Sequence, residues 1–414
     1  MSEAPSALSG SRVLAIAPTP FFSDYGCHVR IFEEVSALQA HGVATTVATY
    51  PFGRDLPGLD VRRSRHIAGP REVSPGSSLH KFSMDVALAG CALRAARSTR
   101  PHLIHGHLHE GALLGWALAR RRGIPLVFDF QGSLTAEMID HGFLSEGSPA
   151  YWAFRSVERW VVDHADAIVT STHHGAEFLS REFSCPEDRI TVVPDGVNAH
   201  RFCPLWIEGG TVDQKEVACL RAQLGLPEGK PVVVYLGLLA EYQGITHLLR
   251  AAQTLVEGSV DVHFLIMGFP GEERYGILAE RLGIGKNVTF TGAIPYERAG
   301  AYLSLGDVAV APKLSLTEGN GKLVNYMAMG LPVVVFDSVV SREILGDLGI
   351  YAPRGDWSAL AVEIAQALAD LPTAQERGRA LRAKAESEHS WESSISLLMG
   401  VYERALARHK AAGS

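Results

Sequence analysis

The chain has 414 residues, of which 47% are hydrophobic and 20% charged, so it is neither a disordered nor a fibrous protein. At roughly 150 residues per domain, its length favours two or three domains over a single core. Lys and Arg number 38 against 45 Asp and Glu, and the net charge of −7 argues against binding of nucleic acid by the whole surface.

Neither disulfides nor a zinc site held by cysteines is expected. The five cysteines are widely spaced and none forms a CxxC pair, which fits a reducing cytoplasm. The opening stretch MSEAPSALSGSR carries an early glutamate and no apolar core, so it does not resemble a signal peptide. No apolar run approaches the ~18 residues of a membrane span. We therefore expect a soluble cytoplasmic protein, and leave open a peripheral contact with the inner face of the membrane.

The first half of the chain alternates short apolar runs with helical patterns. Strands are predicted at residues 12–18, 43–51, 102–107, 125–130, 167–172 and 190–196. A helix over 28–42 joins the first two, with Ile31, Val35 and Leu38 on one face. This order indicates a parallel sheet covered by helices on both faces.

The same alternation restarts after residues 201–230, which are rich in proline and glycine. Further strands are predicted at residues 231–237, 262–268, 287–292, 308–312 and 332–336. The predicted fold is therefore α/β, with two Rossmann-like lobes, residues 1–200 and 201–388, that face a central cleft. Residues 389–414 contain an amphipathic helical pattern, and the sequence leaves open whether this helix crosses back to the first lobe. Ligands of such sheets bind beyond the carboxyl ends of the strands.

Two turns between a strand and a helix contain glycines that would let backbone amides approach an anion. Gly26 precedes the first helix, and Gly237 and Gly244 flank the turn after the strand at 231–237. Free amide groups and the helix dipole favour negative charge at such positions. An ordinary tight turn explains these glycines equally well.

The segment 311–336 is the most informative for chemistry. Glu318 precedes a glycine-rich turn that includes Asn320 and Gly321, and Lys322 opens the next helix. A lysine in the first helical turn opposes the helix dipole, which is easier to understand if a phosphate binds beside it. The alternative is that Lys322 extends into solvent.

Histidines gather where the third predicted strand ends. His105 and His107 alternate along this strand, and His109 and Glu110 open the helix that follows. Because histidine titrates near neutral pH, an acid–base or hydrogen-bonding role at the sheet edge is predicted. A zinc site would require ligands converging from elsewhere, and a purely structural role is the remaining alternative. Gln131 follows the next strand and is expected to border the same crevice.

Over nearly its whole length, the sequence resembles the family 4 glycosyltransferases of the GT-B fold. The stretches that carry the resemblance are residues 18–50, HLIHGH at 102–107, ITVVPDGVNAHRFCP at 190–204, residues 289–337 and HSWESS at 389–394. Members of this family transfer a sugar from a nucleotide-diphosphate donor to an acceptor hydroxyl, with retention of anomeric configuration and without a bound metal. The resemblance therefore implies a retaining, metal-independent glycosyltransferase without a cofactor, since the nucleotide sugar is a co-substrate.

The resemblance also implies roles for single residues. Those expected to bind the donor are Gly26, Gly237, Gly292, Ile294, Asn320, Gly321, Lys322 and Tyr326. His107, His109 and Glu318 are expected to act in catalysis, with Glu318 bonding sugar hydroxyls and His107 matching the family's acceptor-side histidine. Glu110 and Gln131 are expected on the acceptor side.

Four positions depart from the family pattern, one of them Gln131, where the family usually has a histidine. The family usually has an arginine and a lysine where this chain has Leu238 and Gln243, and a second glutamate where it has Tyr326. Our hypothesis is that Lys322 supplies the missing positive charge. Two alternatives stay open: a degenerate nucleotide-sugar-binding protein, which these losses suggest, and a sugar-nucleotide epimerase of similar shape. The acceptor, whether a sugar, a lipid-linked glycan or a small molecule, is not identified by the sequence, and no nucleic-acid partner is expected.

Overall fold

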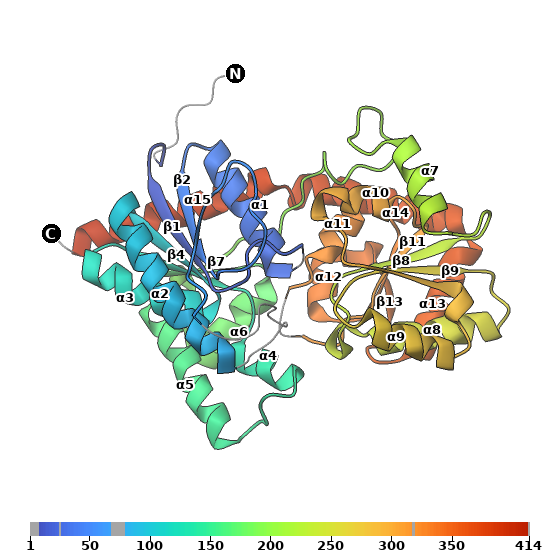
Figure 1. Cartoon of the computed structure of the whole chain (residues 1–414), viewed down its shortest axis with the longest axis horizontal. Helices are drawn as coiled ribbons and strands as arrows, with labels where there is room; N and C mark the ends of the chain where they lie inside the picture. Colours follow the sequence, from blue (N-terminus) through green and yellow to red (C-terminus); the bar gives the residue numbers. More distant parts are fainter. Residues whose placement is uncertain (1–7, 25, 68–78, 317–318, 413–414) are drawn as a thin grey trace.

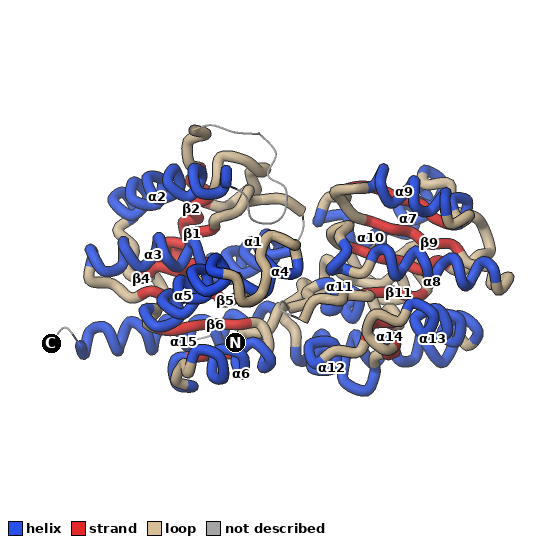
Figure 2. Tube along the Cα trace, turned by 90° about the horizontal axis from the view of Figure 1, so that it is seen from below, coloured by secondary structure: helices blue, strands red, loops and turns tan. Residues whose placement is uncertain are grey.

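A computed structural model describes residues 8–24, 26–67, 79–316 and 319–412, which form two α/β lobes lying side by side (Figure 1). In each lobe, helices cover both faces of a parallel sheet (Figure 2). None of the helices in the described ranges combines the length and apolar character that crossing a bilayer requires.

The first lobe contains a seven-stranded parallel sheet of order β3-β2-β1-β4-β5-β6-β7. Its strands are β1 (Arg12–Ala17), β2 (Ala44–Thr49), β3 (Asp60–Arg63), β4 (Leu103–His107), β5 (Leu126–Phe130), β6 (Ala167–Thr170) and β7 (Ile190–Val192). Its helices are α1 (Gly26–Ala40), α2 (Leu79–Thr99), α3 (Leu108–Arg122), α4 (Leu134–Asp140), α5 (Pro149–His164) and α6 (His173–Phe183). The register sets His107 beside Asp129, so the ends of β4 and β5 share one edge of the sheet.

Local sequence explains where these helices begin and end. α5 starts with Ser148, whose hydroxyl accepts a hydrogen bond from Tyr151 N, and Pro149 occupies the first turn. α3 ends at Gly123, which adopts the left-handed conformation that glycine tolerates best. These caps fix the helix lengths between successive strands.

The second lobe contains a six-stranded parallel sheet of order β10-β9-β8-β11-β12-β13. Its strands are β8 (Val232–Leu236), β9 (His263–Met267), β10 (Val288–Gly292), β11 (Val308–Ala311), β12 (Val333–Phe336) and β13 (Ile350–Ala352). Its helices are α7 (Gln214–Gln223), α8 (Ile245–Glu257), α9 (Glu272–Arg281), α10 (Ala299–Leu303), α11 (Lys322–Ala328), α12 (Val339–Leu345), α13 (Trp357–Ala369) and α14 (Leu371–Glu388). The central strands are almost wholly apolar because helices bury both of their faces.

The last helix, α15 (Trp391–Ala412), crosses back from the second lobe to the first (Figure 1). Leu398 and Tyr402 pack in a buried cluster with Leu38 of α1 and Val127 of β5. The sequence left this packing open, and the structure shows that α15 and α1 together cover one face of the first sheet.

The chain passes between the lobes twice, near Val197 and near His389, and these two segments lie together at the lobe junction. Val197 N donates a hydrogen bond to His389 O at 2.8 Å, and a Cβ on Gly196 would lie 2.7 Å from the Trp391 ring. Glycine is therefore required at 196 for the two segments to approach so closely. The junction fixes one side of the space between the lobes.

Candidate active site

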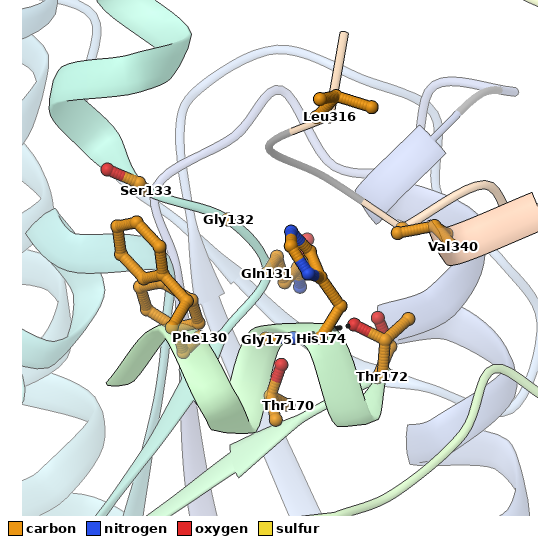
Figure 3. A pocket seen from close by; sticks show the side chains of 13 residues that line it. Phe130, Gln131, Gly132, Ser133, Thr170, Thr172, His174, Gly175, Leu316 and Val340 are labelled. Atoms are coloured by element: carbon orange, nitrogen blue, oxygen red, sulfur yellow. Dashed lines mark hydrogen bonds between the residues drawn. The ribbon is translucent and has the colours of Figure 1, made fainter. Parts of the chain in front are cut away.

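A cavity of about 190 Å³ lies between the lobes, at the carboxyl ends of β5 and β6 (Figure 3). The first lobe contributes the turn 131–133 and the start of α6, including His174. The second lobe contributes Leu316, Gly319 and Val340. Sheet edges of this kind are where open α/β folds bind ligands.

Gln131 is the predicted acceptor-side residue that lines this cavity (Figure 3). Its Nε2 donates a hydrogen bond to Asp129 Oδ2 at 2.6 Å. With the amide nitrogen engaged by Asp129, Gln131 can offer its carbonyl oxygen to a ligand as a hydrogen-bond acceptor. A hydroxyl group is the simplest partner for that oxygen.

His107 lies behind Gln131 and has no exposed surface. Its Nδ1 donates to Asp129 Oδ2 at 2.8 Å. Burial would raise the pKa of Asp129, but the Arg30 guanidinium and the bond from His107 hold that pKa well below its usual value. The His107 ring is sealed inside the sheet edge and reaches the cavity only through Asp129, so its contact with a substrate stays a prediction.

His109 and Glu110 do not line the cavity either. The His109 ring packs edge-on against Phe128 and Phe130, and burial lowers its pKa. Glu110 forms an ion pair of 2.5 Å with Lys81. Each side chain is engaged by packing or pairing within the first lobe, and the expected contacts of both residues with substrate stay predictions.

Asp195 connects the first lobe to the glycine-rich turn of the second. Its Oδ1 accepts a hydrogen bond from Arg30 Nη1 at 2.5 Å. A Cβ on Gly319 or Gly321 would lie 3.4 Å from Asp195 Oδ2. The sequence reasoning assigned no role to Asp195, although it lies in the stretch 190–204 at the lobe junction. Its signal was an acidic residue at the end of the strand predicted at 190–196, directly before Gly196.

Lys322 lies over the glycine turn that follows β8. Its Nζ donates to Gln243 Oε1 at 2.7 Å and to Tyr235 Oη at 3.2 Å. A Cβ on Gly237 would lie 2.8 Å from the same Nζ. The ammonium group therefore lies beside the two positions, 238 and 243, where the family usually carries cations. Extension of Lys322 into solvent, the alternative open from the sequence, is not what the structure shows.

Tyr326 and Ile294, both expected at the donor site, have buried side chains. The Tyr326 side chain is fully buried, and its hydroxyl accepts a hydrogen bond from Leu236 N at 2.7 Å. Ile294 is buried in the apolar core of the second lobe. Neither side chain is exposed to a ligand, because both pack into the core that supports the strand ends.

The remaining donor-side residues are located as follows. Gly26 starts α1 with φ +50°, and a Cβ there would meet nothing within 4 Å. Gly292 ends β10 with φ +71°, and a Cβ there would lie 3.2 Å from Glu272. Asn320 is buried beside Gly321 at the start of α11. Glu318 lies outside the described residues.

A contact that the sequence reasoning missed joins the lobes beside the cavity. Glu343 of α12 accepts hydrogen bonds from His173 N and His174 N, at 2.6 and 3.2 Å, at the first turn of α6. Thr172 caps the same helix by accepting from Gly175 N. Threonine after a strand is a recognisable N-cap signal, whereas the distant Glu343 carries no local signal.

Comparison with known proteins gives a consistent result. Residues 25–196 match a family model described as glycosyl transferase 4-like domain, and residues 218–384 match glycosyl transferases group 1. A D-inositol 3-phosphate glycosyltransferase of Segniliparus rotundus is 29% identical over 407 residues, covering 92% of this chain and 85% of that protein. A 2-deoxystreptamine glucosyltransferase of Streptomyces kanamyceticus is 27% identical over 410 residues, covering 92% of this chain and 100% of that protein.

Solved structures show the same fold. Sucrose-phosphate synthase from Thermosynechococcus elongatus superposes with a TM-score of 0.80 at 22% identity, covering 96% of this chain and 100% of that one. The Anabaena protein HepE in complex with UDP-glucose superposes with a TM-score of 0.71 at 14% identity, covering 95% and 98%. The expected arrangement of two Rossmann-like lobes is confirmed.

Proposed function

We propose that this chain, which belongs to the family 4 glycosyltransferases of the GT-B fold, transfers a sugar from a nucleotide-diphosphate donor with retention of configuration and without a metal at the reacting centre. One observation supports this most: the Lys322 ammonium lies over the Gly237 turn, held by Gln243 and Tyr235. A fixed cation over a glycine turn suits the diphosphate of such a donor. The structure of HepE with UDP-glucose is a precedent for a nucleotide sugar on this fold.

In the proposed reaction, the bond between the anomeric carbon and the phosphate oxygen breaks as the acceptor oxygen bonds to the same carbon. The acceptor hydroxyl attacks from the face that the diphosphate leaves, and its proton passes to a phosphate oxygen. Lys322 stabilises the negative charge that develops on that phosphate. Because Tyr235 and Gln243 fix the ammonium beforehand, little reorganisation is needed as the charge appears.

On the acceptor side, Gln131 would orient the attacking group. Its amide nitrogen is engaged by Asp129, so its oxygen receives the hydrogen of an acceptor hydroxyl. The cavity of about 190 Å³ is smaller than the ~300–1,000 Å³ of common ligand pockets. We therefore propose that a single polar ring enters it, either a free small molecule or the terminal unit of a larger cytoplasmic acceptor.

Lys322→Met is the direct test of this function. Loss of one charge-assisted contact to a phosphate should cost about 1.5–3 kcal/mol, or one to two decades in donor affinity. We expect the Kd for the nucleotide sugar, measured by calorimetry, to rise by this factor and kcat to fall with it. Lys322→Arg is the matched control, because it keeps the charge and should keep a larger share of the binding.

Two results would overturn the proposal. Unchanged donor binding and turnover in Lys322→Met would remove the role of the cation. Conversion of the donor to an epimeric nucleotide sugar, in the absence of any acceptor, would identify an epimerase. Screening of nucleotide sugars by thermal shift selects the donor for both measurements, because a bound ligand stabilises the folded state.

A further inference from the structure

Three metal-ligating side chains converge inside the first lobe, away from the Lys322 turn. Glu34 comes from α1, and His105 and His107 come from β4. One ligand atom from each lies within 4.8 Å of the others, and all three side chains are at most 1% exposed. Glu34 Oε1 is 3.1 Å from His105 Nδ1 and 3.9 Å from His107 Nε2. The sequence showed only the two histidines, and the fold adds the third ligand.

The centre of this cluster is polar, buried and unsatisfied. Among the described residues, both carboxylate oxygens of Glu34 and the Nε2 atom of His107 are buried without a hydrogen-bond partner, although they face each other. His105 Nδ1, the ring atom that approaches Glu34, is already hydrogen-bonded to Tyr402 Oη. Buried polar atoms are nearly always paired in folded proteins, so the facing atoms of Glu34 and His107 indicate a missing partner.

Neighbouring groups orient the two histidines. Asp129 is a carboxylate and can only accept, so His107 must donate from Nδ1, which leaves the Nε2 lone pair turned toward Glu34. Histidines that bind metals usually donate their other ring N–H to a carboxylate in this way. Tyr402 Oη of α15 is hydrogen-bonded to His105 Nδ1 at 2.7 Å, so this nitrogen can bind a metal only when that hydrogen bond opens.

The charges around the cluster do not balance. Among the described residues, no lysine or arginine lies within ion-pair distance of Glu34; its near partners are the two histidines, and the positive charge of Arg30 acts on it only from farther away. Arg30 is closer to Asp195, at 2.5 Å, than to Asp129, at 3.6 Å. Buried carboxylates require a counter-charge, because removing an ion from water is costly. A divalent cation between Glu34 and the histidines would supply it.

We propose that Glu34, His105 and His107 bind one zinc ion inside the first lobe. Two histidines and a glutamate are a known zinc ligand set, with bonds of about 2.0–2.2 Å, which places tetrahedral ligand atoms roughly 3.3 Å apart. Glu34 Oε1 lies 3.1 and 3.9 Å from the two histidine nitrogens, and all three ligand atoms lie within 4.8 Å of one another, so binding would draw them slightly together. The ion would replace the hydrogen bond between His105 and Tyr402, and the freed Tyr402 oxygen or a water molecule would complete the coordination.

The proposed ion has a structural role. It would join α1 to β4 and, through Tyr402, bring α15 to the same point. Asp129 stands between His107 and Gln131, so the ion would support the wall of the cavity from behind without contacting the transferred sugar. This site is independent of the donor turn, and a metal-independent transfer is compatible with it.

Metal content after refolding tests the site, because a buried ion must enter as the chain folds. The full chain is unfolded in guanidinium with a chelator, then refolded with Zn²⁺ or Co²⁺ and desalted. We expect about one metal ion per chain, visible d–d bands of four-coordinate Co²⁺, and a Tm above that of protein refolded with chelator. A refolded chain that retains no metal would overturn the proposal, since the missing partner would then be a proton or water.

The metal content of two variants tests whether the ion binds at this cluster. Glu34→Gln should lose the bound metal, whereas His263→Gln should keep it, because His263 is a buried histidine of β9 that bonds Thr289 outside the cluster. Equal metal content in the two variants would overturn the site. If Glu34→Gln does not fold, X-ray absorption of the zinc-loaded natural chain decides: two imidazoles and oxygen ligands support the site, and sulfur ligands or water alone refute it.

Discussion

The two parallel sheets are similar in layout but differ in what they bury. In the first lobe, the strand ends carry His105, His107 and Asp129, all sealed from solvent, with Glu34 beside them. In the second lobe, β8, β11 and β12 consist of valine and alanine with one tyrosine, one leucine and one phenylalanine, and the polar chemistry lies in turns and at Lys322. In the first lobe, buried histidine and carboxylate side chains therefore support the wall of the cleft. In the second lobe, backbone turns and the ammonium group of Lys322 form it.

This difference predicts where stability and function separate. A buried charge that loses its partner destabilises the fold, because the partner left behind remains desolvated. A cation beside an open turn can be removed at little cost to the fold, since water replaces it. Substitutions in the first lobe should thus act mainly on the free energy of unfolding, and those around Lys322 mainly on binding.

The largest expected effect is that of Asp129→Ala. The substitution leaves Arg30 and His107 without their shared carboxylate, at an expected cost of about 3–5 kcal/mol in the free energy of unfolding. Denaturant unfolding measures it. Ile266→Val, in β9 of the second lobe and equally buried, is the matched comparison and should cost about 0.5–1.5 kcal/mol. Similar losses in the two variants would mean that the buried charges are not what distinguishes the sheets.

The second largest effect expected is a dependence of the free energy of unfolding on pH, caused by His28 of α1. Burial lowers the pKa of His28 from 6.5 to about 3. Below pH 6.5 the unfolded chain binds a proton that the folded chain does not, so this contribution to stability is lost as the pH falls from 6.5 toward 3. At pH 5 the loss should be about 2 kcal/mol.

Denaturant unfolding between pH 5 and 7.5 measures this loss. His28→Gln should flatten the slope by about one proton. His247→Gln, which alters a less buried histidine of α8, should change it less. Parallel pH profiles for the natural chain and His28→Gln would contradict the assignment to His28.

A smaller effect is expected from Tyr326→Phe in the second lobe. Leu236 N loses the acceptor that now lies 2.7 Å away, and a buried unpaired amide costs about 1–3 kcal/mol. Because the Tyr326 hydroxyl is buried, the Kd for the donor should not change. A loss of donor affinity without a loss of stability would instead return Tyr326 to the binding site.

The sequence predicted the strands with helices on both faces because such strands are continuous apolar runs. It missed β3 and β13. β3 is an edge strand of sequence DVRR, whose charges hide its pairing, and β13 has three residues. Charged edge strands are a common protection against aggregation, so they lack the apolar signal used to find strands.

Site residues were predictable from the sequence where they directly follow a strand or open the helix after a turn. Gln131 directly follows β5, and Lys322 opens a helix after a glycine turn. Glu34 was not predictable, since Glu33 and Glu34 are adjacent on one helix and only the fold shows that Glu33 pairs with Arg201 while Glu34 meets two histidines. The burial of the Tyr326 side chain was not predictable either, because a motif position does not reveal which way a side chain points.

The smallest expected effect is at the contact between the lobes. Glu343→Gln keeps an oxygen that can accept from His173 N or His174 N but removes the negative charge at the first turn of α6. Charges at helix N-termini contribute about 0.3–1 kcal/mol. The interaction of Glu343 with the N-terminus of α6 joins the two lobes, so its loss should weaken closure of the cleft more than the stability of either lobe. The KM for the acceptor should therefore rise about two-fold while the unfolding midpoint stays nearly constant. Glu177→Gln, at an exposed ion pair on the same helix, is the matched control and should leave KM unchanged. If both variants raised KM equally, the effect would arise from the loss of a negative charge near α6, and the contact across the cleft would not contribute to closure.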